Sequence, residues 1–437
     1  MSHFTYDELL GDQESAFDYL RSSGLFEPDG EHFVLQGYAG TGKTGLTGAI
    51  AHYAIEQGLT VVVATPTHQA AHVSRQHLPS SVEVRTIHSM LALEVKWQRG
   101  NQVLRRAKNR NPDIPRDALV IVEEASMVGK YQLWPYLREE MISTASVSWL
   151  FVGDPAQLPP VQDEPSPALN AGVGVQLEKP LRVVEGSPLT EVATHVRKHG
   201  VLPSEYPSAP SGVMDENGRE KMMGAFRAKD AHQVVSAFVK RYNGEAGHSI
   251  ILAHTNKKVD RYNQRARHRL FPETTPEEPW AEGMPIKARD TYYNPDTKDR
   301  ICHASQEFLI DEIGTTRKEV VGHTYDVFSL EITPVYGGMP QQVLLPTPEE
   351  KERLEKHTQN ALTNAKANPS QWSRFWGLKE AFPSFRPAFA TTVTKSQGSE
   401  WETVYVDTTD FYTAGDDRDH LLYTAVTRAA KNLVIVQ

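Results

Sequence analysis

The sequence contains a single cysteine, Cys302, in 437 residues. One cysteine excludes an intrachain disulfide and a cysteine cluster for zinc, and it fits a reducing compartment. No apolar run approaches the ~20 residues that a helix needs to cross a bilayer. The first residues, MSHFTYDELL, also lack the basic and then apolar order of a signal peptide. We therefore expect a cytoplasmic protein with no membrane partner.

Basic residues are fewer than acidic ones, and the formal net charge is −9. This balance counts mildly against nucleic-acid binding, although an acidic protein can carry a local basic groove. Hydrophobic residues make up 39% and charged residues 23% of the chain, which is ordinary for globular proteins. At roughly 150 residues per domain, the length predicts about three domains.

The stretch EHFVLQGYAGTGKTGLTGAIAHYAIEQG, residues 31–58, has the order of a strand, a glycine-rich loop and a helix. Its glycines and the GKT end match the phosphate-binding P-loop. Glycines let backbone N–H groups surround a phosphate, and the helix N-terminus adds the positive end of a dipole. We expect Lys43 to reach the terminal phosphates of ATP and Thr44 to bind Mg²⁺. The residues expected at the nucleotide are Gly37, Ala39, Gly40, Thr41, Gly42, Lys43 and Thr44.

Polar motifs follow three further apolar strands. Glu123 and Glu124 come after residues 119–122, and Gln157 follows residues 148–152. Carboxylates at a strand end beside a P-loop are typical of NTPases, which predicts Glu123 on the Mg²⁺ side and Glu124 as the base. Gln157 is placed to sense the γ-phosphate. The third strand, residues 60–64, ends in Thr65-Pro66-Thr67-His68, which suits a phosphate backbone or an empty loop equally well.

Because ligands of open α/β sheets bind at the carboxyl ends of the strands, these motifs predict one site. Gln13, at the start of a helix before the P-loop, offers a donor and an acceptor for an adenine edge. Taken alone, Gln13 is better interpreted as a solvated helix residue, and a lone His88 as structural.

Residues 94–110 are unusually basic. The part from Lys96 to Arg110 contains six basic residues and no acidic residue. Their alternation around Gly100-Asn101 predicts a β-hairpin with Trp97 near its turn. An exposed Trp97 would suit stacking on a base or wedging a duplex, and a buried Trp97 would suit a solvated charged hairpin. Both interpretations stay open.

The second half of the chain changes composition twice. Residues 203–218 are rich in Pro, Ser and Gly and predict a loop. Short alternating strands within 272–385 predict a small β-barrel. Trp372, Phe375 and Trp376 follow a charged helix there; we favour packing of these rings onto a motor domain over a DNA contact. After residue 386 the pattern of strands with polar ends returns.

Seven blocks occur in the order of the superfamily 1 helicase motifs: GYAGTGKT, ATPTHQAA, RTIHS, VEEASM, GDPAQLPPV, TVTKSQGSE and LYTAVTRA. The chain resembles the Dda-type phage helicases, relatives of the RecD-like group. This resemblance implies an α/β fold with two RecA-like P-loop domains. It implies ATP and Mg²⁺ as cofactors, single-stranded and forked duplex DNA as partners, and the host cytoplasm if a phage encodes the chain. It also implies activity as a monomer and names single-strand-binding or other replication proteins as candidate partners.

The resemblance implies domain bounds. The first motor domain would span 1–180, with a β-hairpin pin insert at 90–117. The second would join 181–271 to 386–437, and an SH3-like β-barrel insert with a helical, aromatic extension would fill 272–385. The insert implies 5′→3′ movement on single-stranded DNA.

The resemblance also implies roles for individual residues. Gln13 would read adenine, Arg182 and Arg428 would act as arginine fingers, and Gly398 and Glu400 would lie at the nucleotide. The residues implied along the DNA are Thr65, Pro66, Thr67, His68, Thr86, His88, Trp97, Thr255, Asn256, Thr394 and Lys395. Two positions depart from the family: Glu123 stands where Asp is usual, which puts metal preference in doubt, and Thr394 stands where His is common.

Two other functions fit parts of the pattern. A P-loop kinase would need one motor domain and a substrate lid, without the second set of blocks. A DNA-stimulated ATPase, or a nucleotide-gated binder of single-stranded DNA, would not separate strands. A pure binder needs no catalytic base, so Glu124 argues against the gated binder.

Overall fold

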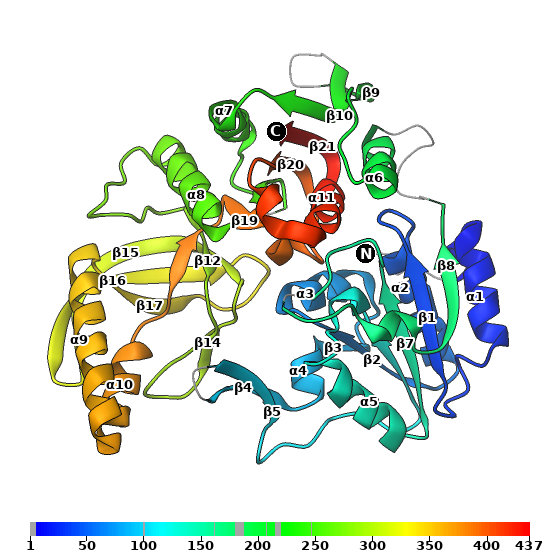
Figure 1. The fold of residues 1–437 in the computed structure, drawn as a ribbon, viewed down its shortest axis with the longest axis horizontal. Helices are drawn as coiled ribbons and strands as arrows, with labels where there is room; N and C mark the ends of the chain where they lie inside the picture. Colours follow the sequence, from blue (N-terminus) through cyan, green and yellow to red (C-terminus); the bar gives the residue numbers. More distant parts are fainter. Residues whose placement is uncertain are drawn as a thin grey trace. The chain divides into compact units, whose positions relative to one another are not determined.

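The computed structural model describes residues 6–98, 101–160, 162–179, 188–206, 208–214, 220–245 and 247–437. These residues form two compact units (Figure 1). Unit 1 comprises residues 1–227 and 396–437, and unit 2 comprises residues 228–395. The finer domain bounds expected from the sequence stay a prediction.

The main sheet of unit 1 has the strand order β3-β2-β6-β7-β1-β8, and all its neighbours pair in parallel. The strands are β1 (His32–Gly37), β2 (Thr60–Thr65), β3 (Glu83–Thr86), β6 (Ala118–Val122), β7 (Val147–Gly153) and β8 (Val173–Leu177). The connecting helices are α1 (Asp12–Ser22), α2 (Lys43–Glu56), α3 (His68–His77), α4 (Ile87–Met90) and α5 (Trp134–Ser143). Short 3₁₀ turns are η1 (Tyr6–Glu8), η2 (Ala125–Met127) and η3 (Pro167–Asn170).

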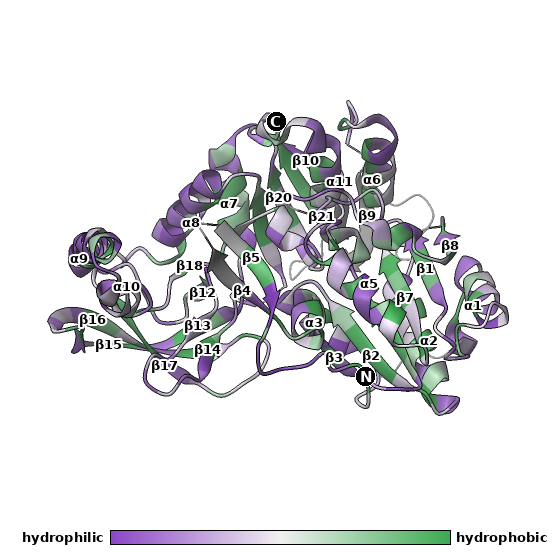
Figure 2. Ribbon diagram, turned by 60° about the horizontal axis from the view of Figure 1, so that its bottom comes forward, coloured by the Kyte–Doolittle hydropathy of each residue, from purple (hydrophilic) through white to green (hydrophobic). Residues whose placement is uncertain are grey.

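Successive residues of these strands point to opposite faces, so the sheet has two cores. Leu119 and Ile121 pack with the helices α1 and α2 on one face. Val120 and Val122 pack with α4 and α5 on the other. Figure 2 shows the hydrophobic colour on β1, β2 and β7, as expected for strands covered on both sides. Burial on both faces fixes the strand register and hence the edge at which the polar motifs emerge.

The rest of unit 1 contains the antiparallel pair β4 (Leu93–Gln98) and β5 (Asn101–Arg106) and a second sheet. In that sheet β20 (Trp401–Asp407) pairs in parallel with β21 (Ala429–Val436), and β9 (Ser208–Met214) pairs antiparallel with β10 (Glu220–Ala228). Its helices are α6 (Pro188–His199), η6 (Phe411–Asp417) and α11 (Arg418–Val426). The loop predicted over 203–218 is therefore partly wrong, because sheet pairing overrides the Pro, Ser and Gly content of residues 208–214.

Unit 2 begins with α7 (Ala231–Arg241), β11 (Ser249–Ala253) and α8 (Asn256–Leu270). Strand β11 pairs in parallel with β19 (Ala390–Thr392), which η5 (Thr394–Ser396) follows. A five-stranded sheet has the order β17-β16-β15-β12-β18. Its strands are β12 (Pro285–Ala288), β15 (Glu307–Val320), β16 (His323–Pro334), β17 (Gln341–Pro346) and β18 (Phe385–Pro387), beside the pair β13 (Tyr292–Tyr293) and β14 (Arg300–Cys302).

Helices α9 (Pro348–Ala367) and α10 (Trp372–Lys379), joined by η4 (Pro369–Gln371), pack on this sheet. Phe375 is buried in a core with Tyr325 and Ala361, and Trp376 packs against that core. The predicted packing onto a motor domain is therefore wrong for this group: Phe375 and Trp376 pack on the insert's own strands within unit 2, and Trp372 is exposed.

Candidate active site

The P-loop follows β1 and is held in shape without a ligand. Gly40 and Gly42 both have φ of 81°, in the left-handed region where glycine carries no penalty. A Cβ on Gly37 would lie 2.7 Å from the Thr41 Oγ1 and 3.2 Å from the Lys43 Cγ, so a side chain there has no room. The Thr41 hydroxyl donates to the Tyr38 carbonyl at 2.8 Å. The backbone is therefore preorganised to accept phosphate oxygens at the start of α2.

The side chains of Lys43 and Gln13 donate hydrogen bonds to opposite ends of the P-loop. The Lys43 ammonium donates to the carbonyls of Gly37, at 2.6 Å, and Tyr38, at 3.1 Å. The buried Gln13 amide donates to the Gly42 carbonyl at 2.9 Å and accepts from the Leu10 N–H at 3.4 Å. Gln13 thus stabilises the loop through this hydrogen bond. Recognition of adenine by Gln13 stays a prediction.

Glu123 and Glu124 follow β6 directly. The Ser74 hydroxyl, on α3, donates to the Glu123 carboxylate. Burial and the neighbouring charge of Glu124 raise the pKa of Glu123 to about 7, against the opposing effects of Ser74 and Lys43. Two adjacent carboxylates in which one pKa is raised fit a divalent cation, which would offset their repulsion. Thr44, in the first turn of α2, and Glu123 are the side chains available to hold it.

Glu124 has φ of 50° and ψ of 40°, a left-handed conformation that is costly for a residue with a side chain. Such backbone strain is of order 1–3 kcal/mol and concentrates at functional sites. The packed strand β6 imposes this turn, so the carboxylate is directed by the fold and not by residue preference.

Gln157 and Asp154 lie in the loop after β7. Gln157 is 5% exposed, and its side-chain oxygen is buried without a hydrogen-bond partner among the described residues. A buried amide oxygen without a partner costs free energy, which is tolerated where a ligand or water completes the site. Asp154 is fully buried, and its carboxylate accepts from the Ala156 N–H at 2.9 Å.

Helix α11 contacts this loop and the P-loop through residues that the sequence motifs did not single out. The Tyr423 hydroxyl accepts from the Ala39 N–H at 3.0 Å and donates to Asp154 Oδ2 at 3.1 Å. Burial and the Asp154 charge raise the pKa of Tyr423, so the hydroxyl keeps its proton. The Thr424 hydroxyl accepts from the Leu158 N–H at 3.0 Å. The motif LYTAVTRA contains both residues but gives no signal of their partners.

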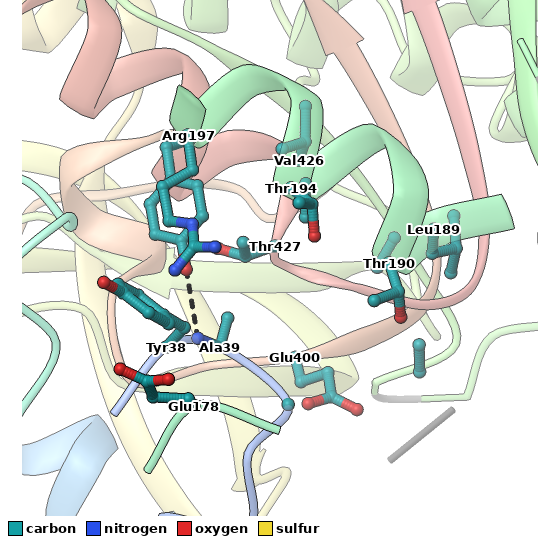
Figure 3. Close-up of a pocket in the computed structure, with 15 residues that line it drawn as sticks. Tyr38, Ala39, Glu178, Leu189, Thr190, Thr194, Arg197, Glu400, Val426 and Thr427 are labelled. Carbon is teal, nitrogen blue, oxygen red and sulfur yellow. Dashed lines mark hydrogen bonds between the residues drawn. The ribbon is translucent and has the colours of Figure 1, made fainter. Parts of the chain in front are cut away.

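A cleft of about 440 Å³ opens between the P-loop, α6 and α11, a size that suits a small ligand. Figure 3 shows Arg197 over the ring of Tyr38, and its guanidinium lies 3.5 Å from the ring centre. Glu178 and Glu400 also line the cleft. Glu400 was predicted at the nucleotide, whereas Arg197 was missed because nothing in its local sequence marks it.

Arg428 lies between α11 and β21 and is 6% exposed. Its guanidinium donates to the carbonyls of Thr424, at 3.1 Å, and Ser399, at 3.2 Å. Burial lowers the pKa of Arg428, and the charges of Glu124 and Asp154 act against that effect. Arg428 therefore lies within the electrostatic range of Glu124 and Asp154. Arg182 lies outside the described residues.

Gly398 follows η5 at φ of 75°, and a Cβ there would lie 2.9 Å from the Ala70 Cβ. The close approach and the left-handed backbone both require glycine. Gly398 thus fixes the path of the chain toward Glu400.

Two family descriptions match the chain: an AAA domain over residues 10–185 and a UvrD-like helicase C-terminal domain over residues 387–436. The ATP-dependent DNA helicase Dda of Enterobacteria phage T4 is 24% identical over 463 residues, covering 99% of this chain and 100% of Dda. The chain is thus similar over its whole length to a superfamily 1 helicase. The ATP-dependent RecD2 DNA helicase of Deinococcus radiodurans is 34% identical over 203 residues, covering 46% of this chain and 25% of RecD2.

Solved structures agree with this fold. A structure of two Pif1 helicases studied at forked double-stranded DNA has a TM-score of 0.53 at 14% identity, covering 98% of this chain and 92% of that one. Bacteroides Pif1 bound to single-stranded DNA has a TM-score of 0.52 at 14% identity with the same coverage. The mixed α/β architecture with parallel sheets is therefore the fold of these Pif1 structures.

The residues predicted along the DNA in unit 1 lie at the ends of β2 and β3. The Thr65 hydroxyl donates to the Thr67 carbonyl at 2.8 Å. Thr67 and Thr86 are the N-caps of α3 and α4, accepting from Ala70 and Ser89. These hydroxyls have structural partners here, and their DNA contacts stay a prediction. Pro66 lies in the turn before α3, and His68 is the first residue of that helix. Burial lowers the pKa of His88 in α4.

In unit 2, Thr255 is the N-cap of α8 and the exposed Asn256 is its first residue. Thr394 and Lys395 lie in η5. Trp97 is in β4, but its side chain lies outside the described part of the structure. Within the described residues, every helix is too short or too polar to span a bilayer.

Proposed function

We propose that this chain is a superfamily 1 helicase that uses ATP to move 5′→3′ along single-stranded DNA and to separate the strands of a forked duplex. One observation carries the proposal. The charges of Lys43 and Glu124 act on the pKa of Glu123, and the charges of Glu124 and Asp154 act on the pKa of Arg428. Helix α11 is hydrogen-bonded both to the P-loop and to the loop of Gln157. A site of this kind links hydrolysis to movement of the elements that build it.

Hydrolysis follows from the placement of charge. Glu124 accepts the proton of the attacking water, because a strained turn at the end of β6 directs its carboxylate, and only β7 separates β6 from the P-loop strand β1. Negative charge that develops on the γ-phosphoryl oxygens is offset by the Lys43 ammonium and by Arg428. The Lys43 ammonium leaves the carbonyls of Gly37 and Tyr38 to reach them. Arg182 contributes a second guanidinium in this proposal.

Mg²⁺ would supply charge neutralisation at the phosphates when bound. Thr44 and Glu123 are the side chains that would hold it. The Ser74 hydroxyl orients the Glu123 carboxylate, and the longer side chain of Glu relative to Asp alters the distance available to the ion's water shell.

Movement follows from the contacts of α11. Gln157 Oε1 is buried and lacks a partner among the described residues, so a γ-phosphate or its attacking water gives it one. Any shift of the Gln157 loop is passed to α11 through Leu158 and Thr424. Affinity for nucleotide and affinity for DNA are then reciprocally linked. In this proposal the hairpin β4–β5 is the strand-separating pin, and residues 272–385 are the SH3-like insert.

The test measures ATP hydrolysis with and without single-stranded DNA, and strand displacement on forks with a 5′ or a 3′ tail. We expect strong stimulation by DNA and displacement only from the 5′-tailed fork. The Glu124→Gln variant is expected to bind ATP and displace no strand. Stimulation without displacement would leave the translocase alternative, and displacement only from the 3′-tailed fork would refute the polarity.

A further inference from the structure

Four cations gather in unit 2: Lys287 and Arg289 on or just after β12, Arg386 on β18, and Lys395 in η5 (the cation cluster). Strands β12 and β18 are antiparallel, and Lys287 lies directly opposite Arg386 in their register. Lys287 is 2% exposed and Arg386 is 3% exposed. Like charges at directly opposed positions destabilise a sheet, and burial increases the cost.

The acidic partners do not satisfy all of these cations. Lys287 has its own partner, Glu307, at 2.7 Å. One carboxylate, Asp260, faces both Arg289, at 3.1 Å, and Arg386, at 3.8 Å. The Arg386 Nη1 also donates to the side chain of Asn256 at 3.4 Å, and its Nη2 is buried with no hydrogen-bond partner in the part of the chain that the structure describes.

The pKa shifts within the cation cluster also indicate an excess of positive charge. Burial lowers the pKa of Arg386, and the charge of Arg289 lowers it further. Partial burial and the charges of Arg386, Lys287 and Arg289 lower the pKa of Lys395, which Asp290 only partly opposes. Positive charge is therefore in excess around the exposed Lys395. An anion at this position would relieve the repulsion and give a partner to the guanidinium.

Helix α8 adds to the positive potential at the cation cluster. Its first residue is Asn256, whose side chain accepts from Arg386. Because the contacted Asn256 is at the N-terminus of this 15-residue helix, the positive end of the helix dipole lies near Arg386. Asn256 and Lys395 were both predicted along the DNA from the sequence alone, whereas Lys287, Arg289 and Arg386 were not.

We propose that the cation cluster binds a backbone phosphate of the single DNA strand, with Arg289 and Lys395 at the opening and Lys287 and Arg386 as the buried charges beneath it. This inference rests on the proposed binding of single-stranded DNA and adds residues to it. A phosphodiester fits because each group offers charge and N–H donors without selecting a base. The site therefore grips DNA of any sequence.

The first test measures the affinity for single-stranded DNA over a range of salt concentrations. Each phosphate contact contributes a slope of about −0.7 in log K against log salt for single strands. Arg289→Gln is expected to weaken binding several-fold for every sequence and to reduce the slope by about that amount. The matched control is Arg317→Gln, an exposed arginine of unit 2 that pairs with Asp326 as Arg289 pairs with Asp260.

The second test compares stability with affinity in Arg386→Met. Methionine fills a similar volume without the unpaired buried charge, so the thermal midpoint is expected to stay or rise while DNA affinity falls. A merely structural arginine gives the reverse, a lower midpoint with unchanged affinity.

The outcomes separate the two proposals. If the wild-type protein binds no single-stranded DNA, the proposed function fails and this inference fails with it. If the wild type binds DNA but Arg289→Gln keeps the wild-type affinity and slope, only the cation cluster is refuted. If Arg386→Met does not fold, the salt dependence of DNA binding by Arg289→Gln decides whether the cation cluster binds a phosphate.

Discussion

Arg428 is a buried guanidinium that three backbone or hydroxyl oxygens hold at the end of α11. Burial lowers the pKa of Arg428, and the negative charge of Glu124 acts against that effect. We expect Arg428→Ala to bind ATP normally and to lose about 10³–10⁵ in turnover, the range for arginine fingers in related NTPases. Nucleotide binding by fluorescence and steady-state ATPase rates provide the measurement.

A second variant separates charge from packing in that prediction. Arg428→Lys keeps the charge and much of the volume, so it should fold and recover part of the rate without the planar donor geometry. Wild-type turnover in Arg428→Ala would show that this residue does not act on the transition state.

Tyr423 joins the P-loop and the loop after β7 through one oxygen atom. Tyr423→Phe leaves the Ala39 N–H and one Asp154 oxygen without a partner, at about 1–3 kcal/mol. We expect a roughly tenfold or greater loss of DNA-stimulated kcat, with unchanged DNA affinity in the absence of nucleotide. Tyr292→Phe is the control, because it removes a hydroxyl that donates to the Ala381 carbonyl in unit 2. Equal effects of the two variants would contradict a positioning role for Tyr423.

At the scale of elements, helix α9 packs on β16 through a pair of stacked histidines. His323 and His357 stack with ring centres 4.1 Å apart, and His357 Nδ1 bonds the Tyr325 hydroxyl at 2.7 Å. Burial lowers the pKa of His357, and the charges of His323, Arg353 and Arg374 lower it further, against Glu350. The folded protein therefore favours neutral His357.

The sign of the resulting pH dependence follows by linkage. Because the folded pKa lies below the unfolded value of 6.5, the stabilisation is complete above that pH and is lost as the pH falls below it. We expect the thermal midpoint of the wild type to fall between pH 7.5 and 5.5 more steeply than that of His357→Gln. Parallel pH profiles from thermal melting of the two proteins would contradict the assignment.

Element boundaries show where local sequence was a sufficient guide. The P-loop was predicted correctly because strand, glycines and helix lie within one short stretch. The segment around Arg428 shows where local sequence is not sufficient: α11 stops at Val426, and β21 starts at Ala429. Alanines favour a helix, but pairing of Trp401 with Ala429 draws that segment into the sheet. Arg428 lies at this junction.

At the scale of the whole molecule, nucleotide and DNA are expected to bind cooperatively. A non-hydrolysable ATP analogue should change the affinity for single-stranded DNA by the same factor by which the DNA changes the affinity for the analogue. Anisotropy with labelled DNA and titration calorimetry with the analogue measure the two factors. Unequal factors at equilibrium would indicate binding to more than one site, and a factor of one for both would remove the coupling on which movement depends.

The sequence by itself determined the residues whose chemistry is local. Lys43 and Thr44 are identified by their distance from glycines along the chain, and Glu123 and Glu124 by the apolar strand before them. Only the tertiary structure decided the contacts that join distant segments. Ala39 and Tyr423 are separated by 384 positions, and Arg197 reaches Tyr38 from α6. Spacing along a chain encodes backbone geometry over a few residues, whereas these contacts exist because packed sheets and helices fix where separate segments meet.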